Sequence, residues 1–131
     1  MTRPLVCVIE DYPDSRVLIL AVLSNAGMEV VTAESGVELD AVLATGREPN
    51  LFLIDLSLPG EDGTSILRRL RLDPRFKDTP MVALTAHAMA GEAERGRAAG
   101  FDDYITKPID ISTLPARLSE FVRSGGEELA R

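Results

Sequence analysis

Short apolar segments of strand length recur along the chain, and they constrain its fold more than any other feature. The segments LFLI at 51–54 and MVAL at 81–84 are continuously apolar, with no alternation between apolar and polar residues. Continuous runs of this length are typical of parallel strands that are covered on both faces. We predict five strands, at 5–9, 29–32, 51–54, 81–84 and 104–106.

Helix signals occupy the segments between the predicted strands. Pro13 begins a helix that Gly27 ends, and Ser35 is the expected N-cap of a second helix. In the last helix Pro115 fits only in the first turn, which requires Ser112 to be the N-cap. The predicted helices span 13–26, 37–44, 63–72, 88–99 and 112–123.

Strands that alternate with helices favour one fold class. Short connections between them imply right-handed βαβ units, and these build an α/β fold with a doubly wound, five-stranded parallel sheet and helices on both faces. Five units suit the flavodoxin-like strand order 2-1-3-4-5. In that architecture ligands bind beyond the carboxyl ends of the strands, beside the first and third.

Size and composition fit one domain and argue against several functions. With 131 residues, 45% of them hydrophobic, the chain is large enough to bury one core. We expect a domain over 1–124 and a flexible C-terminal tail over 125–131. A net charge of −7 argues against direct nucleic-acid binding, which needs clustered basic residues. No apolar run reaches the roughly 18 to 20 residues that span a bilayer, so we expect a cytoplasmic protein without membrane insertion.

Polar residues directly follow four of the five predicted strands. They are Glu10 and Asp11 after the first strand, Asp55 after the third, Thr85 after the fourth and Lys107 after the fifth. Because parallel strands all point the same way, these side chains are expected to converge at one edge of the sheet. Each residue alone would be interpreted as a helix cap, a turn residue or a surface lysine. Together they coincide with the strands that flank the expected ligand site.

Three carboxylates at one edge repel one another unless a cation separates them. Two unit charges about 4 Å apart cost on the order of 4 kcal/mol at an effective dielectric near 20. Mg²⁺ is held by oxygen ligands, typically one or two carboxylates plus phosphate oxygens. We therefore assign Asp11 and Asp55 as direct ligands and Glu10 as a ligand through water. We choose Asp55 as the carboxylate that attacks phosphorus, with Lys107 and Thr85 contacting the phosphate.

Four segments carry a family resemblance. They are VIED at 8–11, LIDLSLPGEDG at 53–63, ALTA at 83–86 and YITKP at 104–108. On these segments the chain resembles the receiver domain of two-component response regulators, over about 3–122. The resemblance implies a single-domain, chemotaxis-regulator-like protein.

The resemblance also implies roles for individual residues. Glu10 and Asp11 form an acidic pocket, Asp55 is the phosphoacceptor, and the backbone carbonyl of Ser57 completes the Mg²⁺ shell. Phosphorylation of a receiver is read out by a hydroxyl that moves toward the phosphate and an aromatic ring that follows it.

In this chain the readout pair is Thr85 and Tyr104. Without the resemblance, Tyr104 would be interpreted as a strand aromatic that packs beside a helix. The Lys107–Pro108 peptide bond is expected to be cis by resemblance, whereas the sequence alone favours trans.

Partners follow from the same resemblance. The phosphodonor is a histidine kinase or a histidine phosphotransfer protein, and the output is a downstream protein target or a homodimer. The chain is then not a conventional enzyme, because it promotes only its own Mg²⁺-dependent phosphorylation and dephosphorylation. His87 is interpreted as an exposed loop residue. The first helix has seven apolar residues in succession at 17–23, so some must face away from the sheet, covered by other segments or available to a partner.

Three alternatives stay open at this point. A Mg²⁺-dependent phosphohydrolase also uses an aspartyl nucleophile, but usually with a second Asp two residues later, where this chain has Ser57. A flavin-binding electron carrier shares the fold, but the acidic segment at 10–12 would repel a phosphate in the absence of metal. The chain could also be a receiver excised from a larger hybrid kinase.

Overall fold

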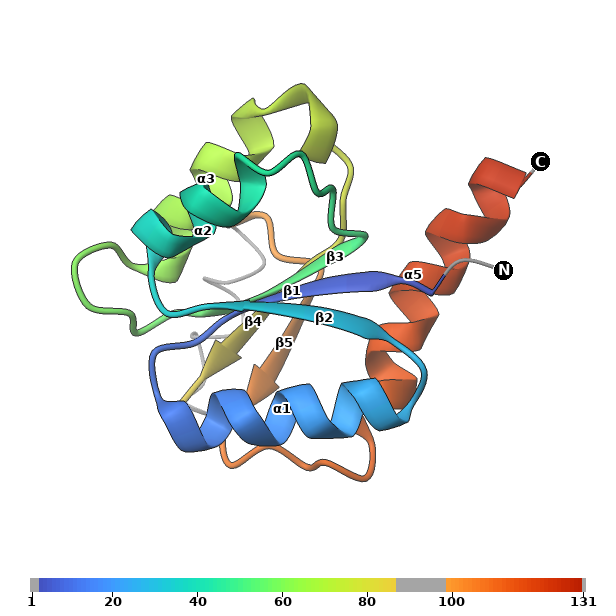
Figure 1. Cartoon of the computed structure of the whole chain (residues 1–131), viewed down its shortest axis with the longest axis horizontal. Coiled ribbons are helices and arrows are strands. Elements are labelled where there is room, and N and C mark those ends of the chain that lie inside the picture. Colours follow the sequence, from blue (N-terminus) through green and yellow to red (C-terminus); the bar gives the residue numbers. More distant parts are fainter. Residues whose placement is uncertain (1–2, 87–98, 131) are drawn as a thin grey trace.

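A computed structural model describes residues 3–86 and 99–130, and for 123–130 it describes the helix without its side chains. Five parallel strands form one sheet in the order β2-β1-β3-β4-β5. The predicted fold class and strand order are therefore confirmed (Figure 1). The strands are β1 (Leu5–Ile9), β2 (Glu29–Ala33), β3 (Leu51–Asp55), β4 (Met81–Thr85) and β5 (Asp103–Thr106).

Three strands extend one residue further than predicted at their carboxyl ends. Asp55 pairs with Leu84 and Thr85 pairs with Thr106 in the parallel register. The ladder continues past these residues, since Leu56 N donates to Leu84 O at 2.9 Å and Lys107 N donates to Thr85 O at 2.7 Å. Asp55 and Thr85 are thus held by the sheet itself and not by a loop.

Helices α2 and α3 cover one face of the sheet, and α1 and α5 cover the other (Figure 1). Ser35 is the N-cap of α2 as predicted, because its Oγ accepts from Glu38 N at 3.2 Å. The predicted helix at 88–99 lies outside the described residues except for its last position, as does His87. The helices are α1 (Pro13–Asn25), α2 (Gly36–Leu43), α3 (Gly63–Leu72) and α5 (Leu114–Ala130), with a 3-10 turn at η1 (Pro74–Phe76).

The start of α5 corrects one prediction. Ser112 is not the N-cap, because Asp110 organises a turn before the helix: its Oδ1 accepts from Ser112 N at 3.0 Å and its carbonyl accepts from Leu114 N at 3.1 Å. Helix α5 begins at Leu114, so Pro115 still lies in the first turn, where a backbone N–H would lack a partner. The helix continues to Ala130 instead of ending at 123. The domain boundary at 124 and the flexibility of 125–131 stay predictions.

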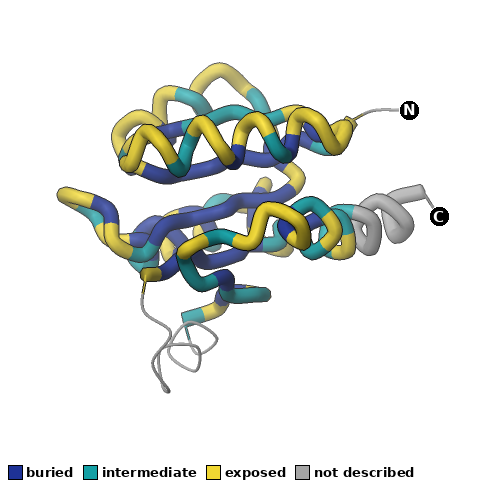
Figure 2. Tube along the Cα trace, turned by 90° about the horizontal axis from the view of Figure 1, so that it is seen from below, coloured by how far each residue is buried: buried dark blue, intermediate teal, exposed yellow. Residues whose placement is uncertain are grey.

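The core has two parts, one on each face of the sheet, and Figure 2 shows the buried strands that lie between them. Successive strand residues point to opposite faces, so Cys7 and Ile9 pack on the α2–α3 side whereas Val6 and Val8 pack on the α1–α5 side. Burial raises the pKa of the Cys7 thiol to about 12, which agrees with a structural role. The continuous apolar runs therefore fill two cores at once.

Helix α1 is only partly covered. Ile19 and Leu23 are buried, while Val17 is 63% exposed and Leu18 is 42% exposed. The prediction that part of this apolar run faces away from the sheet is confirmed. No helix in the described ranges is both long and apolar enough to cross a membrane.

Candidate functional site

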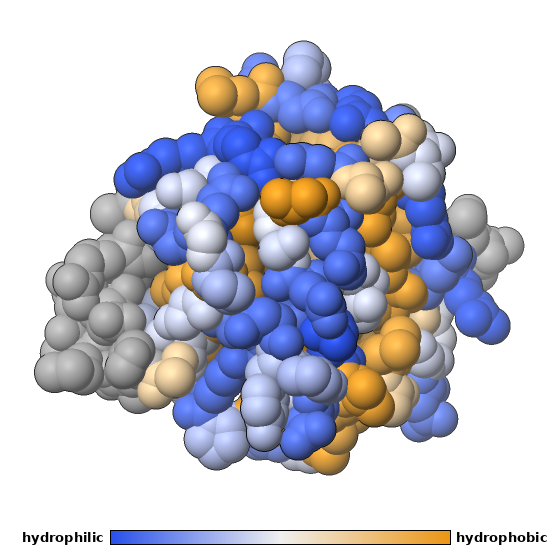
Figure 3. Space-filling view, turned by 60° about the vertical axis from the view of Figure 1, so that its left-hand side comes forward, coloured by the Kyte–Doolittle hydropathy of each residue, from blue (hydrophilic) through white to orange (hydrophobic). Residues whose placement is uncertain are grey.

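Three charged side chains meet at the carboxyl ends of the strands. Lys107 follows β5, and its Nζ lies 2.5 Å from Glu10 Oε1 and 2.8 Å from Asp55 Oδ2. Glu10 follows β1 and Asp55 ends β3, so the parallel sheet brings together residues far apart in the chain. Figure 3 turns this edge toward the viewer, and hydrophilic residues predominate in the centre of the view.

The three acidic residues form a compact cluster. One carboxylate oxygen from each of Glu10, Asp11 and Asp55 lies within 4.8 Å of the others. Glu10 is fully buried and Asp55 is 3% exposed, whereas Asp11 is exposed. Glu10 Oε2 is buried and has no hydrogen-bond partner among the described residues. An unpartnered buried carboxylate oxygen is costly, and this all-oxygen cluster suits a hard divalent cation such as Mg²⁺.

The pKa values of the two buried carboxyl groups in the cluster are shifted in opposite directions. Burial, together with the neighbouring Asp55, raises the pKa of Glu10 to about 7, although Lys107 acts in the opposite direction. Burial also raises the pKa of Asp55, but hydrogen bonds from Glu10, Lys107 and the Ser57 N–H outweigh it, and the net pKa is lowered. Burial lowers the pKa of Lys107, and its contacts with Asp55 and Glu10 more than compensate. Asp55 is therefore the carboxylate that stays ionised most readily.

Each oxygen of Asp55 has its own partner. Ser57 N donates to Oδ1 at 2.8 Å, and Lys107 Nζ contacts Oδ2 at 2.8 Å. The two contacts fix the orientation of the carboxylate at the end of β3. The Ser57 carbonyl as a metal ligand, and Glu10 as a ligand through water, stay predictions.

The predicted readout pair lies on the two neighbouring strands. Thr85 ends β4 and is buried, and Tyr104 lies in β5, half-buried against the α2–α3 side of the core. Tyr104 is opposite Ala83 in the β4–β5 register, two residues before Thr85. The Lys107–Pro108 peptide bond is cis.

Arg16 is a site residue that the sequence analysis missed. Its Nη1 donates to the carbonyl oxygens of Glu10 at 3.1 Å and Asp11 at 3.3 Å, and its Nη2 lies 2.9 Å from Glu34 Oε1. The guanidinium thus holds the backbone of both acidic residues. The sequence does contain an indication of this role. A basic residue near the positive N-terminus of a helix, as Arg16 is, is unfavourable unless it has an anionic or carbonyl partner.

Gly63 is a second residue whose role was missed. A Cβ atom built there would lie 2.5 Å from the carbonyl oxygen of Asp55 and 2.9 Å from Leu56 Cα, both of them backbone atoms. Gly63 N also donates to Leu56 O at 3.2 Å. The first residue of α3 is therefore packed directly against the phosphoacceptor candidate, and only glycine fits without a shift.

Comparisons with known proteins agree with this geometry. Residues 6–119 match the family described as the response regulator receiver domain. The DNA-binding dual master transcriptional regulator RpaA of Synechocystis sp. is 37% identical over 120 residues, which are 92% of this chain and 49% of that protein. The chain thus spans about half the length of the curated relatives that head the comparison.

Solved structures give the same result. The chemotaxis response regulator CheY4 of Vibrio cholerae has a TM-score of 0.84 at 27% identity, covering 92% of this chain and 99% of that one. The receiver domain of sensor histidine kinase PA1611 from Pseudomonas aeruginosa PAO1, with a magnesium ion coordinated in its active-site cleft, has a TM-score of 0.81 at 29% identity, covering 92% and 98%. The chain belongs to the response regulator receiver domain family.

Proposed function

We propose that this chain is a Mg²⁺-dependent switch that accepts a phosphoryl group on Asp55 from a histidine kinase or a histidine phosphotransfer protein. Receiver domains of two-component signalling are switches and not conventional enzymes. One observation carries the proposal: the Lys107 ammonium lies against Asp55 Oδ2 at the strand edge, beside two further carboxylates. This arrangement supplies a nucleophile, a cation for the phosphate and donors for a metal.

The residues of the chain divide the chemistry among them. Asp55 is ionised at neutral pH because hydrogen bonds lower its pKa, and one of its oxygens forms the bond to phosphorus as the bond to the donor breaks. The Ser57 N–H holds the other oxygen. Lys107 stays within reach of the phosphoryl oxygens and stabilises their charge. When held by Glu10, Asp11, Asp55 and the Ser57 carbonyl, Mg²⁺ would neutralise charge on the incoming phosphoryl group.

The readout is proposed to pass through Thr85 and Tyr104. Thr85 is buried at the end of β4, the strand next to the one that ends at Asp55, and its hydroxyl would hydrogen-bond a phosphoryl oxygen on Asp55. Tyr104 is half-buried on the neighbouring strand, and its ring would move inward when the Thr85 hydroxyl moves toward the phosphate. Such a pair converts a local charge change into a change of surface.

Partner binding is proposed at the exposed part of α1. Val17, Leu18 and Leu20 are 63%, 42% and 38% exposed, and they lie on the helix that follows the loop carrying Glu10 and Asp11. A phosphodonor that docks there would place its phosphohistidine near the strand edge. The output is a downstream protein or a second copy of the chain, without direct nucleic-acid contact.

The test compares wild type with Asp55→Asn. Both proteins are incubated with a small phosphodonor, with and without Mg²⁺, and the intact mass is measured. The proposal expects phosphorylation of wild type only with Mg²⁺ and none of the variant. Label on Asp55→Asn, or label that ignores Mg²⁺ removal, would overturn it. Sustained turnover of small phosphate esters by wild type would favour a phosphohydrolase.

A further inference from the structure

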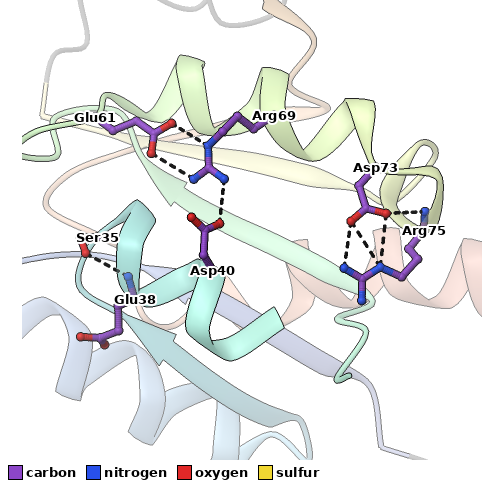
Figure 4. Close-up of polar contacts among 7 residues, drawn as sticks. All are labelled: Ser35, Glu38, Asp40, Glu61, Arg69, Asp73 and Arg75. Atoms are coloured by element: carbon purple, nitrogen blue, oxygen red, sulfur yellow. Dashed lines mark hydrogen bonds and ion pairs between the residues drawn. The ribbon is translucent and has the colours of Figure 1, made fainter. Parts of the chain in front are cut away.

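A three-residue salt bridge joins the loop after β3 to two helices (Figure 4). Arg69 of α3 binds both carboxylate oxygens of Glu61, with Nε 2.7 Å from Oε2 and Nη2 3.0 Å from Oε1. Its Nη1 lies 2.7 Å from Asp40 Oδ1 of α2. Glu61 belongs to the segment 56–62 that connects Asp55 to α3, so Arg69 ties this segment to both helices on that face of the sheet.

The backbone of α2 is shaped to receive Glu61. A Cβ atom built on Gly36 would lie 2.0 Å from Glu61 Oε1 and 3.0 Å from Arg69 Nη2. Any side chain at position 36 would therefore displace the carboxylate from its present place. The missing side chain and the bidentate ion pair are two independent features of the same contact.

The segment 56–62 is also held close to Asp55. Ser57 N donates to Asp55 Oδ1 at 2.8 Å, and Gly63 N donates to Leu56 O at 3.2 Å. Between these points Pro59 and Gly60 are exposed, and Gly60 has a φ of 83°. Asp62 caps α3 by accepting from Ser65 N at 2.9 Å, and Glu61 is the charged side chain of this stretch that binds Arg69.

A second ion pair, directly after the end of α3, serves as a comparison for this contact. Asp73 and Arg75 also form a bidentate pair, with Nη2 2.9 Å from Oδ2, at the far end of α3 (Figure 4). That pair joins residues two apart in sequence and holds no distant segment. An exposed ion pair alone contributes little to stability, so the value of the Arg69 contact lies in what it positions.

We propose that Arg69 and Glu61 are positioning residues for the phosphorylation site: they hold segment 56–62 so that the Ser57 backbone stays in place for Mg²⁺ and for Asp55. This inference rests on the proposed function. It makes α2 and α3, which carry none of the proposed metal or phosphate ligands, part of the machinery that sets the Mg²⁺ affinity.

Gly36→Ala is the sharpest variant, because it changes no charge. The new methyl group would meet the far end of a flexible side chain, so the protein can fold while the Glu61 carboxylate must move. In an NMR titration of the full chain with MgCl₂, we expect the dissociation constant for Mg²⁺ to rise by about 10-fold, the lower end of the loss seen when residues that orient metal ligands indirectly are changed. Faster amide hydrogen exchange at 57–61 in the Mg²⁺-free protein is the second readout.

Arg69→Met separates positioning from simple electrostatics. Removing a positive charge from the neighbourhood of an acidic cluster should by itself strengthen binding of a cation. Loss of positioning should instead weaken Mg²⁺ binding, by about 10-fold on the same argument. Arg75→Met is the matched control and should bind Mg²⁺ as wild type does. Arg69→Lys keeps the charge but not the bidentate fork, so it should resemble Arg69→Met.

The outcomes distinguish this inference from the proposed function. If wild type binds Mg²⁺ and is phosphorylated, but Gly36→Ala and Arg69→Met retain wild-type affinity and wild-type exchange at 57–61, the positioning role is wrong. Tighter Mg²⁺ binding by Arg69→Met, or Arg69→Lys behaving as wild type, would likewise overturn it. If wild type itself neither binds Mg²⁺ nor is phosphorylated, the proposed function fails first.

Discussion

Two loops flank Asp55, and an arginine holds each of them in a different way. In the first loop, 10–12, Arg16 donates to the backbone carbonyls of the acidic residues themselves, and its side chain is only 18% exposed. The second loop, 56–62, is held by Arg69 of α3, which binds the side chain of Glu61. The Arg69 side chain is 39% exposed. The first contact is partly buried, and the second lies on the surface.

The two loops therefore differ in how firmly their backbones are held. Glu10 is buried, and its Oε2 has no hydrogen-bond partner within 3–86 and 99–130, so the position of the carboxylate depends on a fixed backbone. Segment 56–62 is mostly exposed and depends on a surface contact. We expect the Arg16 contact to influence stability more and the Arg69 contact to influence Mg²⁺ binding more.

The largest effect on phosphorylation is expected at Lys107, which contacts Glu10 in the first loop and Asp55 just before the second. Lys107→Met should lower the rate of phosphorylation by a small phosphodonor by about 100- to 1000-fold, the usual loss when a donor to a developing oxyanion is removed. Lys77→Met, an exposed lysine before the start of β4, is the control. Equal rates for Lys107→Met and wild type would remove Lys107 from the mechanism.

The first loop is tested by Glu10→Gln. The pKa of Glu10 is raised to about 7, so between its ordinary value of 4.5 and pH 7 the folded protein holds a proton that the unfolded chain releases. Stability therefore falls as pH rises through this window. Without Mg²⁺, the variant should be more stable than wild type by about 3 kcal/mol at pH 8, at 1.36 kcal/mol per pKa unit.

Urea unfolding at pH 4 and pH 8 measures this difference. The two proteins should differ little at pH 4, where the carboxyl group of Glu10 is protonated in the folded protein. Glu120→Gln, at an exposed position on α5, should not alter the profile. If wild type instead gains stability relative to Glu10→Gln as the pH rises, the predicted direction of the pH dependence is wrong.

The second loop is tested by a pair of glycine variants. At Gly63 a new methyl group meets backbone atoms of Asp55 and Leu56, which cannot move aside, whereas at Gly36 it meets the end of a side chain. Gly63→Ala should lower the free energy of unfolding by about 2 kcal/mol, as for overpacked sites. Gly36→Ala should keep wild-type stability. Thermal unfolding of both variants and of wild type measures the difference. Equal stability would mean that the backbone at Gly63 yields.

The smallest effect compares the two arginines directly. Arg16→Met removes two hydrogen bonds to carbonyls and an ion pair, and should cost about 1 kcal/mol of stability. Arg69→Met should cost less, because exposed ion pairs contribute roughly 0 to 1 kcal/mol. Chemical denaturation of both variants is the measurement. A larger loss for Arg69→Met would reverse the assignment of the two loops.

Much of the fold follows from the sequence because buried parallel strands leave a plain pattern. The apolar runs predicted every strand to within one residue at each end, since a strand covered on both faces has little room for polar residues. The site followed from the same pattern. Once the strands are parallel, Glu10, Asp55 and Lys107 have to meet at one edge, and the structure places them in contact.

Contacts that depend on helix placement could not be predicted. Arg69 meets Asp40 across 29 positions of sequence, and only the packing of α3 beside α2 brings them together. The predicted N-cap of α5, Ser112, was wrong. Asp110 and Ser112 are both good turn formers, and it is Asp110 that organises the turn before the helix. The role of Gly63 depends on how closely α3 approaches the end of β3, which no sequence pattern records.

The most direct measurement identifies the phosphorylated residue itself. Wild-type protein is incubated with a small phosphodonor and Mg²⁺, the acyl phosphate is reduced with borohydride, and the modified position is found by peptide mass spectrometry. Reduction converts an aspartyl phosphate to homoserine, and we predict homoserine at position 55 only in the sample that contained Mg²⁺. Homoserine at another aspartate, or at position 55 without Mg²⁺, would contradict the proposed function.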